Sequence, residues 1–474
     1  MKNQKTTMGL KNKFSFILLL LISPLISNAQ KDTTVVLNFS TFLQVVKLHH
    51  PLIKQADLIT KSAKANTLLA RGNFDPNVFY EFNNKFFESK NYYEFQNAGF
   101  KIPTWYGIEL KGGIEQNQGI NLNPESITPS EGLAYTQISI PLLQGLIIDE
   151  RRSILKQAKL FQIQSNYDKT IAINEILYKA GKAYWEWQLS YNNLQVHQSA
   201  VTLSKERFEA VKRTSVLGDR PAIDTVEAII QLQDRILTLQ QSQIDFRTKS
   251  LLLSNFLWLE NDIPIELTNN TIPDVVNISG NNFYASVSSI DSMINNHPTL
   301  KIYDLKLKQL DIEKEFKKDK LKPNLDVNYN PLFTSNNFNA SLQNNYKWGI
   351  SLGFPIFLRK ERGDLQQTKL KIENTTLDII NKRNEIRNKI NASINELNTY
   401  KNQVEIYSNN AKNYEKLWLS EKRLFDSGES SLFMINSREQ SYINAQIKLN
   451  EILNKNKKTS LEIEYSYGVL NMIY

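Results

Sequence analysis

The sequence contains no cysteine and only four histidines among its 474 residues. The absence of cysteine excludes disulfides, thiolate nucleophiles, zinc-ribbon sites and a lipid-modified N-terminal cysteine. The four histidines are His49, His50, His197 and His297, which is little material for histidine-based catalysis. No carboxylate or cysteine set accompanies His49-His50, so we assign this pair to a helix end rather than to a metal. We find no GxSxG, P-loop, HExxH or GxGxxG pattern either, and we expect neither a metal, nor a cofactor, nor an enzyme.

The chain also has little excess charge of one sign. It contains 57 Lys and Arg residues against 48 Asp and Glu residues, which gives a net charge of +9. Four of the lysines lie in residues 1–29, which contain no acid, so +9 less these four leaves +5 for the remainder. The other basic residues are scattered among acids, and we therefore expect no nucleic-acid partner.

Residues 1–29 are typical of a secretory signal peptide. A basic start leads into an apolar run at 14–22, Pro24 follows the run, and small residues at 27–29 are suited to cleavage. The run is shorter than the roughly 20 apolar residues that a membrane-spanning helix requires. We expect the mature chain to begin at Gln30 and to leave the cytoplasm; the alternative is a retained anchor.

The rest of the chain contains an internal duplication. The offset between matching positions is 247 residues for the first pairs, 214 for the next and 210 for the last. The matches are His50-Pro51 with His297-Pro298, Pro76-Asn77 with Pro323-Asn324, Pro141 with Pro355, and Gly218 with Gly428. We divide the chain into the signal peptide, a first repeat at 30–261, a linker at 262–285 and a second repeat at 286–474. The change of offset places 33 extra residues in the first repeat, which are either an added hairpin or a longer external loop.

Each repeat changes its hydrophobic period in the same order. It begins with an amphipathic helix and continues with strands that alternate apolar or aromatic residues with small or polar ones. Long segments follow: 153–217 contains a single helix breaker, Gly181, and 364–427 contains neither glycine nor proline. At 1.5 Å per residue these segments predict helices about 95 Å long, which few globular domains could bury. Gly218 and Gly428 are placed to end them as left-handed caps, before a return helix in each repeat.

Strands of this kind in a secreted chain point to a membrane. Strands of 7–11 residues are long enough to cross an outer membrane when tilted, and lipid requires every strand edge to be paired. One chain has too few strands for the smallest barrels of about 8, so closure requires several copies, whose helices would continue the ring as a tube. The strand residues that we expect to face lipid are Ile108, Leu110, Ile138, Ile140, Trp348, Ile350, Leu352 and Phe354.

This order of elements resembles the TolC-type outer-membrane factors of Gram-negative efflux and secretion systems. The local similarities are Phe39-Ser40-Thr41-Phe42 before His49-His50-Pro51, Ile138-Ser139-Ile140-Pro141-Leu142, Leu217-Gly218 with Asp224-Thr225-Val226-Glu227-Ala228, Ser351-Leu352-Gly353-Phe354-Pro355, and Gly428-Glu429-Ser430-Ser431-Leu432. The resemblance implies an α+β membrane protein in which three identical chains form a transmembrane β-barrel of four strands each, continued by a long α-helical barrel through the periplasm. It also implies a duct without chemistry of its own, in the outer membrane, against which a periplasmic adaptor and an inner-membrane pump dock.

The resemblance further implies two groups of site residues at the far end of the helices. The residues expected to meet the adaptor lie in the two helix–helix turns and are Leu217, Gly218, Asp219, Arg220, Ser427, Gly428, Glu429 and Ser430. Some family members narrow the closed tip with carboxylates six and nine residues after the second turn glycine, where this chain has Met434 and Ser437. The first repeat has acids at the matching offsets, Asp224 and Glu227. These two carboxylates, rather than residues of the second repeat, are therefore an alternative set of gate residues.

The sequence therefore predicts an exit duct for efflux or type I secretion. The alternative is a secreted, elongated coiled-coil scaffold or adaptor without a pore, which would explain the long helices and the signal peptide. It would not explain strands that point apolar and aromatic residues outward with no covering layer. A secreted hydrolase is disfavoured because no nucleophile or acid/base pair is evident.

Overall fold

The structure is a computed structural model that describes residues 35–268, 270–274, 290–334 and 345–474. The predicted signal peptide, residues 1–29, lies outside the described residues, and so do residues 275–285 of the predicted linker. Within the described ranges, no helix combines the length and the apolarity needed to cross a membrane.

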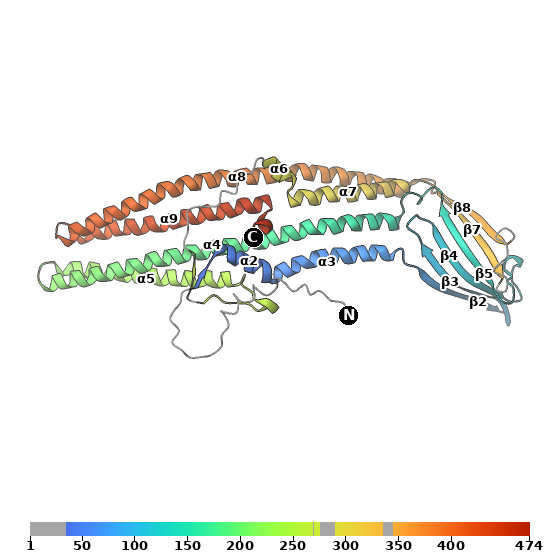
Figure 1. The fold of residues 1–474 in the computed structure, drawn as a ribbon, viewed down its shortest axis with the longest axis horizontal. Helices are drawn as coiled ribbons and strands as arrows, with labels where there is room; N and C mark the ends of the chain where they lie inside the picture. Colours follow the sequence, from blue (N-terminus) through green and yellow to red (C-terminus); the bar gives the residue numbers. More distant parts are fainter. Residues whose placement is uncertain (1–34, 269, 275–289, 335–344) are drawn as a thin grey trace, which may run out of the picture.

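The molecule is an elongated layer of helices with a β-sheet at one end (Figure 1). Two helices, α4 (Glu150–Val216) and α8 (Arg359–Asp426), run through most of its length with 67 and 68 residues. At 1.5 Å per residue each spans roughly 100 Å, as the scarcity of glycine and proline predicts. Four shorter helices accompany them: α3 (Pro51–Gly72), α7 (Pro298–Asp319), α5 (Ala222–Ser254) and α9 (Leu432–Tyr467).

The helices lie side by side, with four helices across the layer both near the sheet and in the half far from it. Next to the sheet the order across the layer is α3, α4, α7, α8, and in the far half it is α5, α4, α9, α8. The layer therefore has two lateral edges. One edge is formed by α8 along its whole length, and the other by α3 and α5 in succession.

Six antiparallel strands form the sheet, in the order β2-β3-β4-β5-β7-β8. Their bounds are β2 (Asn77–Phe87), β3 (Lys90–Pro103), β4 (Glu109–Gln118), β5 (Leu133–Pro141), β7 (Asn324–Thr334) and β8 (Tyr346–Gly353). The first repeat contributes four strands and the second two. The 33 extra residues are thus an added hairpin, β3–β4, that is paired into the sheet between β2 and β5.

Two of the predicted strand residues, Ile108 and Phe354, lie just outside the strands, so their prediction as strand residues was wrong. The carbonyl of Ile108 accepts hydrogen bonds from the Thr104 N–H (2.9 Å) and the Thr104 hydroxyl (2.6 Å), which closes a turn before β4. Phe354 is followed by Pro355, which has no N–H with which to continue the ladder of β8.

The largest core lies around the middle of α4, where short elements pack against it. These are α2 (Phe39–His49), α10 (Leu470–Ile473) and the parallel pair of β1 (Val35–Leu37) with β6 (Thr271–Pro273). Phe42, Tyr184 and Trp187 are completely buried here. The Tyr184 hydroxyl donates to the Leu37 carbonyl (2.7 Å) and the Trp187 indole N–H donates to the Ser250 hydroxyl (3.1 Å), so both polar groups are satisfied. A further short helix, α6 (Ile290–Asn295), packs on α8.

The His-Pro pairs of the two repeats begin equivalent helices. The ring nitrogens Nδ1 of His50 and His297 accept the N–H of Leu52 and of Thr299, each at 3.2 Å, and a proline follows each histidine at the first helical position. The helix-end role predicted for the first pair is confirmed for His50. The first return helix ends at Ser254, because the chain reverses there and the Ile265 N–H donates back to the Leu257 carbonyl (3.0 Å).

A neutral histidine at the start of α7 predicts a loss of stability in acid. Burial, followed by the nearby charges of Lys382 and Lys389, lowers the pKa of His297 from 6.5 to about 4. Between these values the unfolded chain takes up a proton that the folded chain does not, so the free energy of unfolding falls as the pH falls from 6.5 to 4, by about 3 kcal/mol in full. Asparagine keeps a cap acceptor but cannot titrate. We expect His297→Asn to flatten the fall of the unfolding midpoint between pH 7 and pH 4.5; slopes identical to the wild type would contradict this assignment.

Candidate functional site

The sheet has one apolar face and one mainly polar face, which follows from its register. Residues paired directly across neighbouring strands lie on the same face, and Leu110, Ile138, Tyr329 and Trp348 form one such row. The apolar face comprises Val78, Tyr80, Phe82, Phe100, Leu110, Ile114, Ile138, Ile140, Leu325, Val327, Tyr329, Phe333, Trp348, Ile350 and Leu352. The polar face includes Asn77, Glu81, Lys101, Lys111, Gln137, Ser139, Asp326, Asn328, Lys347 and Ser351, together with a few aromatic side chains such as Phe79.

The apolar face is uncovered in the described part of the chain. Val78, Ile350 and Leu352 are 88%, 60% and 70% exposed. The helices continue from one end of the sheet and do not lie over it (Figure 1). Six of the eight residues predicted to face lipid are strand residues of this face, and Ile108 and Phe354 flank it. A contiguous apolar surface of this kind requires an apolar environment or a partner.

Both outer strands of the sheet have an unpaired edge within the described residues. All residues but one are exposed in β2, and the same is true of β8. Such an edge presents a row of free N–H and C=O groups, which another strand can pair with. Because β2 leads away from the helices and β8 leads back to them, a β8 strand placed beside β2 in the same orientation would be antiparallel to it.

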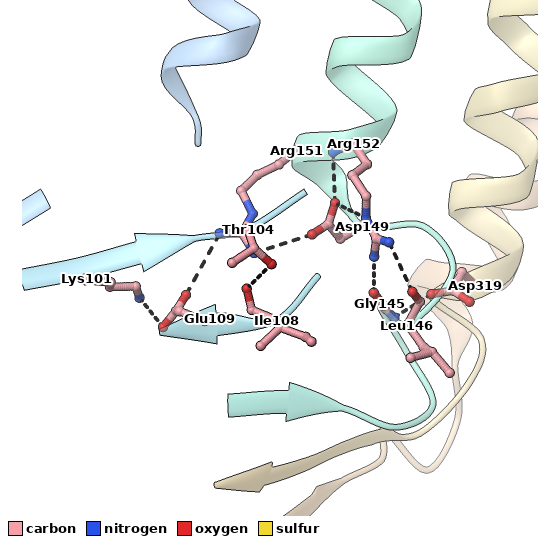
Figure 2. Close-up of polar contacts among 10 residues, drawn as sticks. All are labelled: Lys101, Thr104, Ile108, Glu109, Gly145, Leu146, Asp149, Arg151, Arg152 and Asp319. Atoms are coloured by element: carbon pink, nitrogen blue, oxygen red, sulfur yellow. Dashed lines mark hydrogen bonds and ion pairs between the residues drawn. The ribbon is translucent and has the colours of Figure 1, made fainter. Parts of the chain in front are cut away.

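Polar contacts fix the place where the sheet meets the helices (Figure 2). The Asp149 carboxylate caps α4 by accepting the Arg152 N–H at 2.8 Å, and it also pairs with the Arg152 guanidinium at 3.1 Å. The guanidinium in turn donates to the carbonyls of Gly145 and Leu146. The buried Asp319 carboxylate at the end of α7 accepts the Gly145 N–H at 2.6 Å. The loop between β5 and α4 is thereby tied to both repeats. No group of three or more His, Asp or Glu residues in the described ranges is arranged to hold a metal.

Two nearly identical turns form the far end of the helical layer. Gly218 and Gly428 have φ angles of 86° and 82°, a left-handed conformation that favours glycine. Asp219 N–H donates to the Thr214 carbonyl (3.0 Å) and Glu429 N–H donates to the Leu424 carbonyl (2.8 Å), which completes a Schellman motif in each repeat. The predicted caps are confirmed. The eight residues predicted for docking thus share one end of the molecule, where Val216 and Leu217 are 83% and 76% exposed.

The four predicted gate residues lie just behind these turns. Asp224 pairs with Arg220 at 3.6 Å, and the Arg220 guanidinium lies over the Phe425 ring at 4.3 Å. Glu227 accepts a hydrogen bond from the Asn436 amide at 3.0 Å, which links α5 to α9. Met434 and Ser437 are exposed on α9. The two acids of the first repeat are therefore engaged in contacts within the chain.

A buried charge cluster between the two helical hairpins was missed by the sequence reasoning. Glu439 on α9 is completely buried and pairs with Arg207 of α4, and Arg235 of α5 lies 4.0 Å from it. Asn436 accepts from Arg207 (2.8 Å) and Gln440 accepts from Arg235 (2.5 Å). A signal did exist: Arg207 lies 11 residues before Gly218 and Glu439 lies 11 residues after Gly428, so both sit at the same height above turns of equal geometry.

The comparisons with known proteins bear on this arrangement. No protein-family model and no curated protein sequence matches the chain. Solved structures do: the Campylobacter jejuni CmeC outer membrane channel is 13% identical, with a TM-score of 0.67, 99% of this chain covered and 93% of that chain. The chain has the outer-membrane channel fold. Two further structures agree. The Neisseria gonorrhoeae MtrE outer membrane channel in its open state has a TM-score of 0.65 and 11% identity, with 93% of each chain covered. The outer membrane protein VceC of Vibrio cholerae has a TM-score of 0.62 and 10% identity, with 91% of this chain and 96% of that chain covered. The resemblance predicted from the sequence is confirmed at the level of this fold.

Within this fold, Glu439 joins the two helical hairpins through its contacts with Arg207 and Arg235. Removing its carboxylate is therefore expected to lower the stability of the folded chain strongly. Glu439→Ala leaves two buried guanidinium groups without their counter-charge, a change that costs about 3–5 kcal/mol. Glu451→Ala is the matched control, because its partner Lys448 is on the surface and such a pair contributes at most about 1 kcal/mol. We expect the thermal unfolding midpoint to fall strongly for the first variant and hardly at all for the second. Equal midpoints would mean that the cluster does not couple the hairpins.

Proposed function

We propose that the protein is the exit duct of a tripartite efflux or type I secretion system in the outer membrane of a Gram-negative bacterium. Three copies form one channel, and the helices extend into the periplasm. The single observation that carries the proposal is a sheet with an uncovered apolar face and two unpaired edges, continuous with a helical layer roughly 100 Å long. Such a sheet is stable in lipid only when further copies pair its edges.

The lateral edges of the helical layer favour the same assembly. On α5, exposed apolar residues recur at every seventh position, a spacing that is typical of a helix packed against another helix. This α5 seam consists of Ile223, Ile230, Leu237, Ile244 and Leu251, which are 44% to 74% exposed. The opposite edge, α8, also exposes apolar residues, among them Leu377, Ile380 and Ile406. Because the two edges differ, the contact between copies is head to tail, and a closed sheet requires that this contact complete a ring.

The two faces of the sheet fit the proposed environment. The apolar face points to lipid and the polar face to a water-filled lumen, as in outer-membrane barrels. Tyr106 and Trp105 lie at the helix-side end of the sheet and Tyr92 near its other end, where interfacial aromatic residues are expected. A soluble coiled-coil scaffold, the second candidate, would have no use for this uncovered face.

The tip of the helices is proposed as the docking surface for a periplasmic adaptor and its inner-membrane pump. The two turns are solvent-exposed, and apolar side chains are exposed on and beside them, including Leu217 (76%) in the first turn and Phe433 (70%) at the start of α9. Asp224 and Glu227, with Met434 and Ser437, lie within three turns of helix from this surface and are proposed to shape the entrance.

One experiment separates the duct from the scaffold. The protein is expressed in a Gram-negative host, the periplasm is released by osmotic shock, and the membranes are fractionated. A duct remains with the outer membrane, requires detergent for extraction and migrates as a trimer. A scaffold is released as a water-soluble protein, and that result would exclude the duct.

The orientation of the sheet predicts different effects for two neighbouring residues of β8. Ile350→Arg places a charge on the apolar face, which costs about 2–4 kcal/mol near the middle of the bilayer. Ser351→Arg places the same charge on the polar face and is the matched control. We expect the first variant to lose detergent-resistant trimers in the outer membrane and the second to retain them. Normal assembly of both would show that the apolar face does not meet lipid.

The docking proposal predicts loss of export without loss of assembly when a tip turn is altered. An added Cβ at Gly428 has no atom within 4 Å, so Gly428→Val strains only the left-handed turn, by about 1–2 kcal/mol, and changes its outer surface. Gly363→Val is the control, since Gly363 lies on the exposed start of α8 with equally open surroundings. We expect trimers in both variants, and accumulation of a pump substrate only in the first. Wild-type export by the Gly428→Val variant would remove the tip turn from the docking surface.

A further inference from the structure

The added hairpin β3–β4 is a full part of the sheet. β3 pairs with β2 from Lys90 to Lys101 and with β4 from Glu94 to Pro103. The rows of the apolar face nearest the helices pass through it, and one of them joins Tyr80, Ala98, Ile114, Ala134 and Phe333; farther from the helices the row of Phe82 continues into Gln96 and Gln116. The hairpin thus has a lipid-compatible face in register with that of its neighbours, which an external loop would not need.

The turn of this hairpin is anchored where the sheet meets the helices. Glu109 at the start of β4 pairs with Lys101 of β3 at 2.8 Å and with Arg151 of α4 at 3.9 Å (Figure 2). On the same turn, the Trp105 ring stacks on Phe74, which follows α3, with centroids 4.1 Å apart.

A close approach fixes the position of the turn. Gly107 has a φ angle of 84°, and a Cβ there would lie 2.8 Å from the Arg152 guanidinium. Since Arg152 also holds the start of α4, the hairpin and the helical layer share the same fixed contact.

The width of the sheet can be compared with the width of the helical layer from which it continues. Strands about 4.8 Å apart and tilted by about 40° take up about 6.3 Å of circumference each, so six strands cover about 38 Å. Four helices at spacings of 8–10 Å cover about 32–40 Å. Four strands would cover only about 25 Å by the same measure. The six strands therefore match the arc of their own helices, whereas four would force the wall to narrow.

From these observations we propose that each copy supplies six strands to the barrel, so that a trimer has eighteen rather than twelve and the passage stays as wide in the membrane as among the helices. The proposal rests on the proposed function, because it requires copies of the chain to form a ring. The contact between copies joins β2 of one to β8 of the next. Eighteen strands give a backbone-to-backbone diameter of about 36 Å, half again that of twelve strands.

The width has a consequence for the solutes that pass. Barrels of 16–18 strands leave an open aqueous channel. The lumen of this one is lined by amide, hydroxyl and glycine positions and a few aromatic side chains, with charges of both signs, such as Lys101, Lys111, Glu81 and Asp326. The strands thus form a broad hydrophilic passage without strong preference for the sign of the solute's charge.

The absence of cysteine makes the strand order directly testable with engineered pairs. Lys111→Cys with Gln137→Cys places the thiols on directly paired positions of β4 and β5, within the roughly 7 Å that a disulfide allows between Cα atoms. Asn77→Cys with Ser139→Cys tests the alternative. The alternative is a four-strand wall in which β2 lies next to β5, as β7 lies next to β8 in the second repeat. There Asn324 pairs with Gly353, and the offsets of 247 and 214 residues make Asn77 and Ser139 the equivalent pair.

In the six-strand wall β2 and β5 are three strand spacings apart, about 14 Å. We therefore expect the first pair to form an intrachain disulfide in the outer-membrane trimer and the second pair to form none, as read by peptide mapping under non-reducing conditions. A disulfide in the second pair, or none in the first, overturns the proposal.

Direct images of the detergent-extracted ring complete the test. Cross-sections with eighteen strands for three copies support the proposal, and cross-sections with twelve overturn it while leaving the exit duct intact. A monomer that is soluble without detergent would instead overturn the proposed function itself.

Discussion

The structure depends on one constraint: an unpaired strand edge and an uncovered apolar face cannot coexist stably in one free molecule. The β-sheet of this chain has two such edges and one such face among its described residues. Water would solvate the edges but not the face, and lipid would solvate the face but not the edges. In the proposed duct, copies of the sheet set edge to edge within a bilayer satisfy both. The head-to-tail seams on the helices, which run along the same two sides, then follow the same ring.

The helical layer is held at its joints by specific side-chain contacts, which in the proposed duct would extend the ring far from the membrane. Arg152 and Asp319 fix the start of α4 to both repeats, and the aromatic core around Trp187 holds the middle. Glu439 joins the two hairpins near the tip. The Asp319 and Glu439 contacts join the two repeats, whereas Arg152 and the Trp187–Ser250 hydrogen bond act within the first repeat.

Much of this could be predicted from the sequence because long helices and strands are local patterns. The stretch 364–427 has no glycine or proline, and the alternation from Tyr346 to Leu352 has one period throughout. Ile108 and Phe354 were assigned wrongly because alternation alone does not reveal a turn closed by Thr104 or a ladder stopped by Pro355. The number of strands stayed open because a hairpin and a loop of similar composition differ only in their partners. The Glu439 cluster depends on three helices meeting at one height, which no single segment encodes.

The two repeats are alike at one end of the molecule and unlike at the other. At the tip, Gly218 and Gly428 end helices of 67 and 68 residues with the same hydrogen bonds, so a ring of three copies would present six nearly equivalent turns. In the sheet the first repeat contributes four strands and the second two. A partner that docks on the tip meets a surface of nearly sixfold regularity and constrains both repeats equally. Lipid makes no such demand, because it requires only that the sheet be closed and its outer face apolar. In the proposed duct the membrane end is therefore free to change its width by adding a hairpin to one repeat, while the tip would keep the spacing that docking requires.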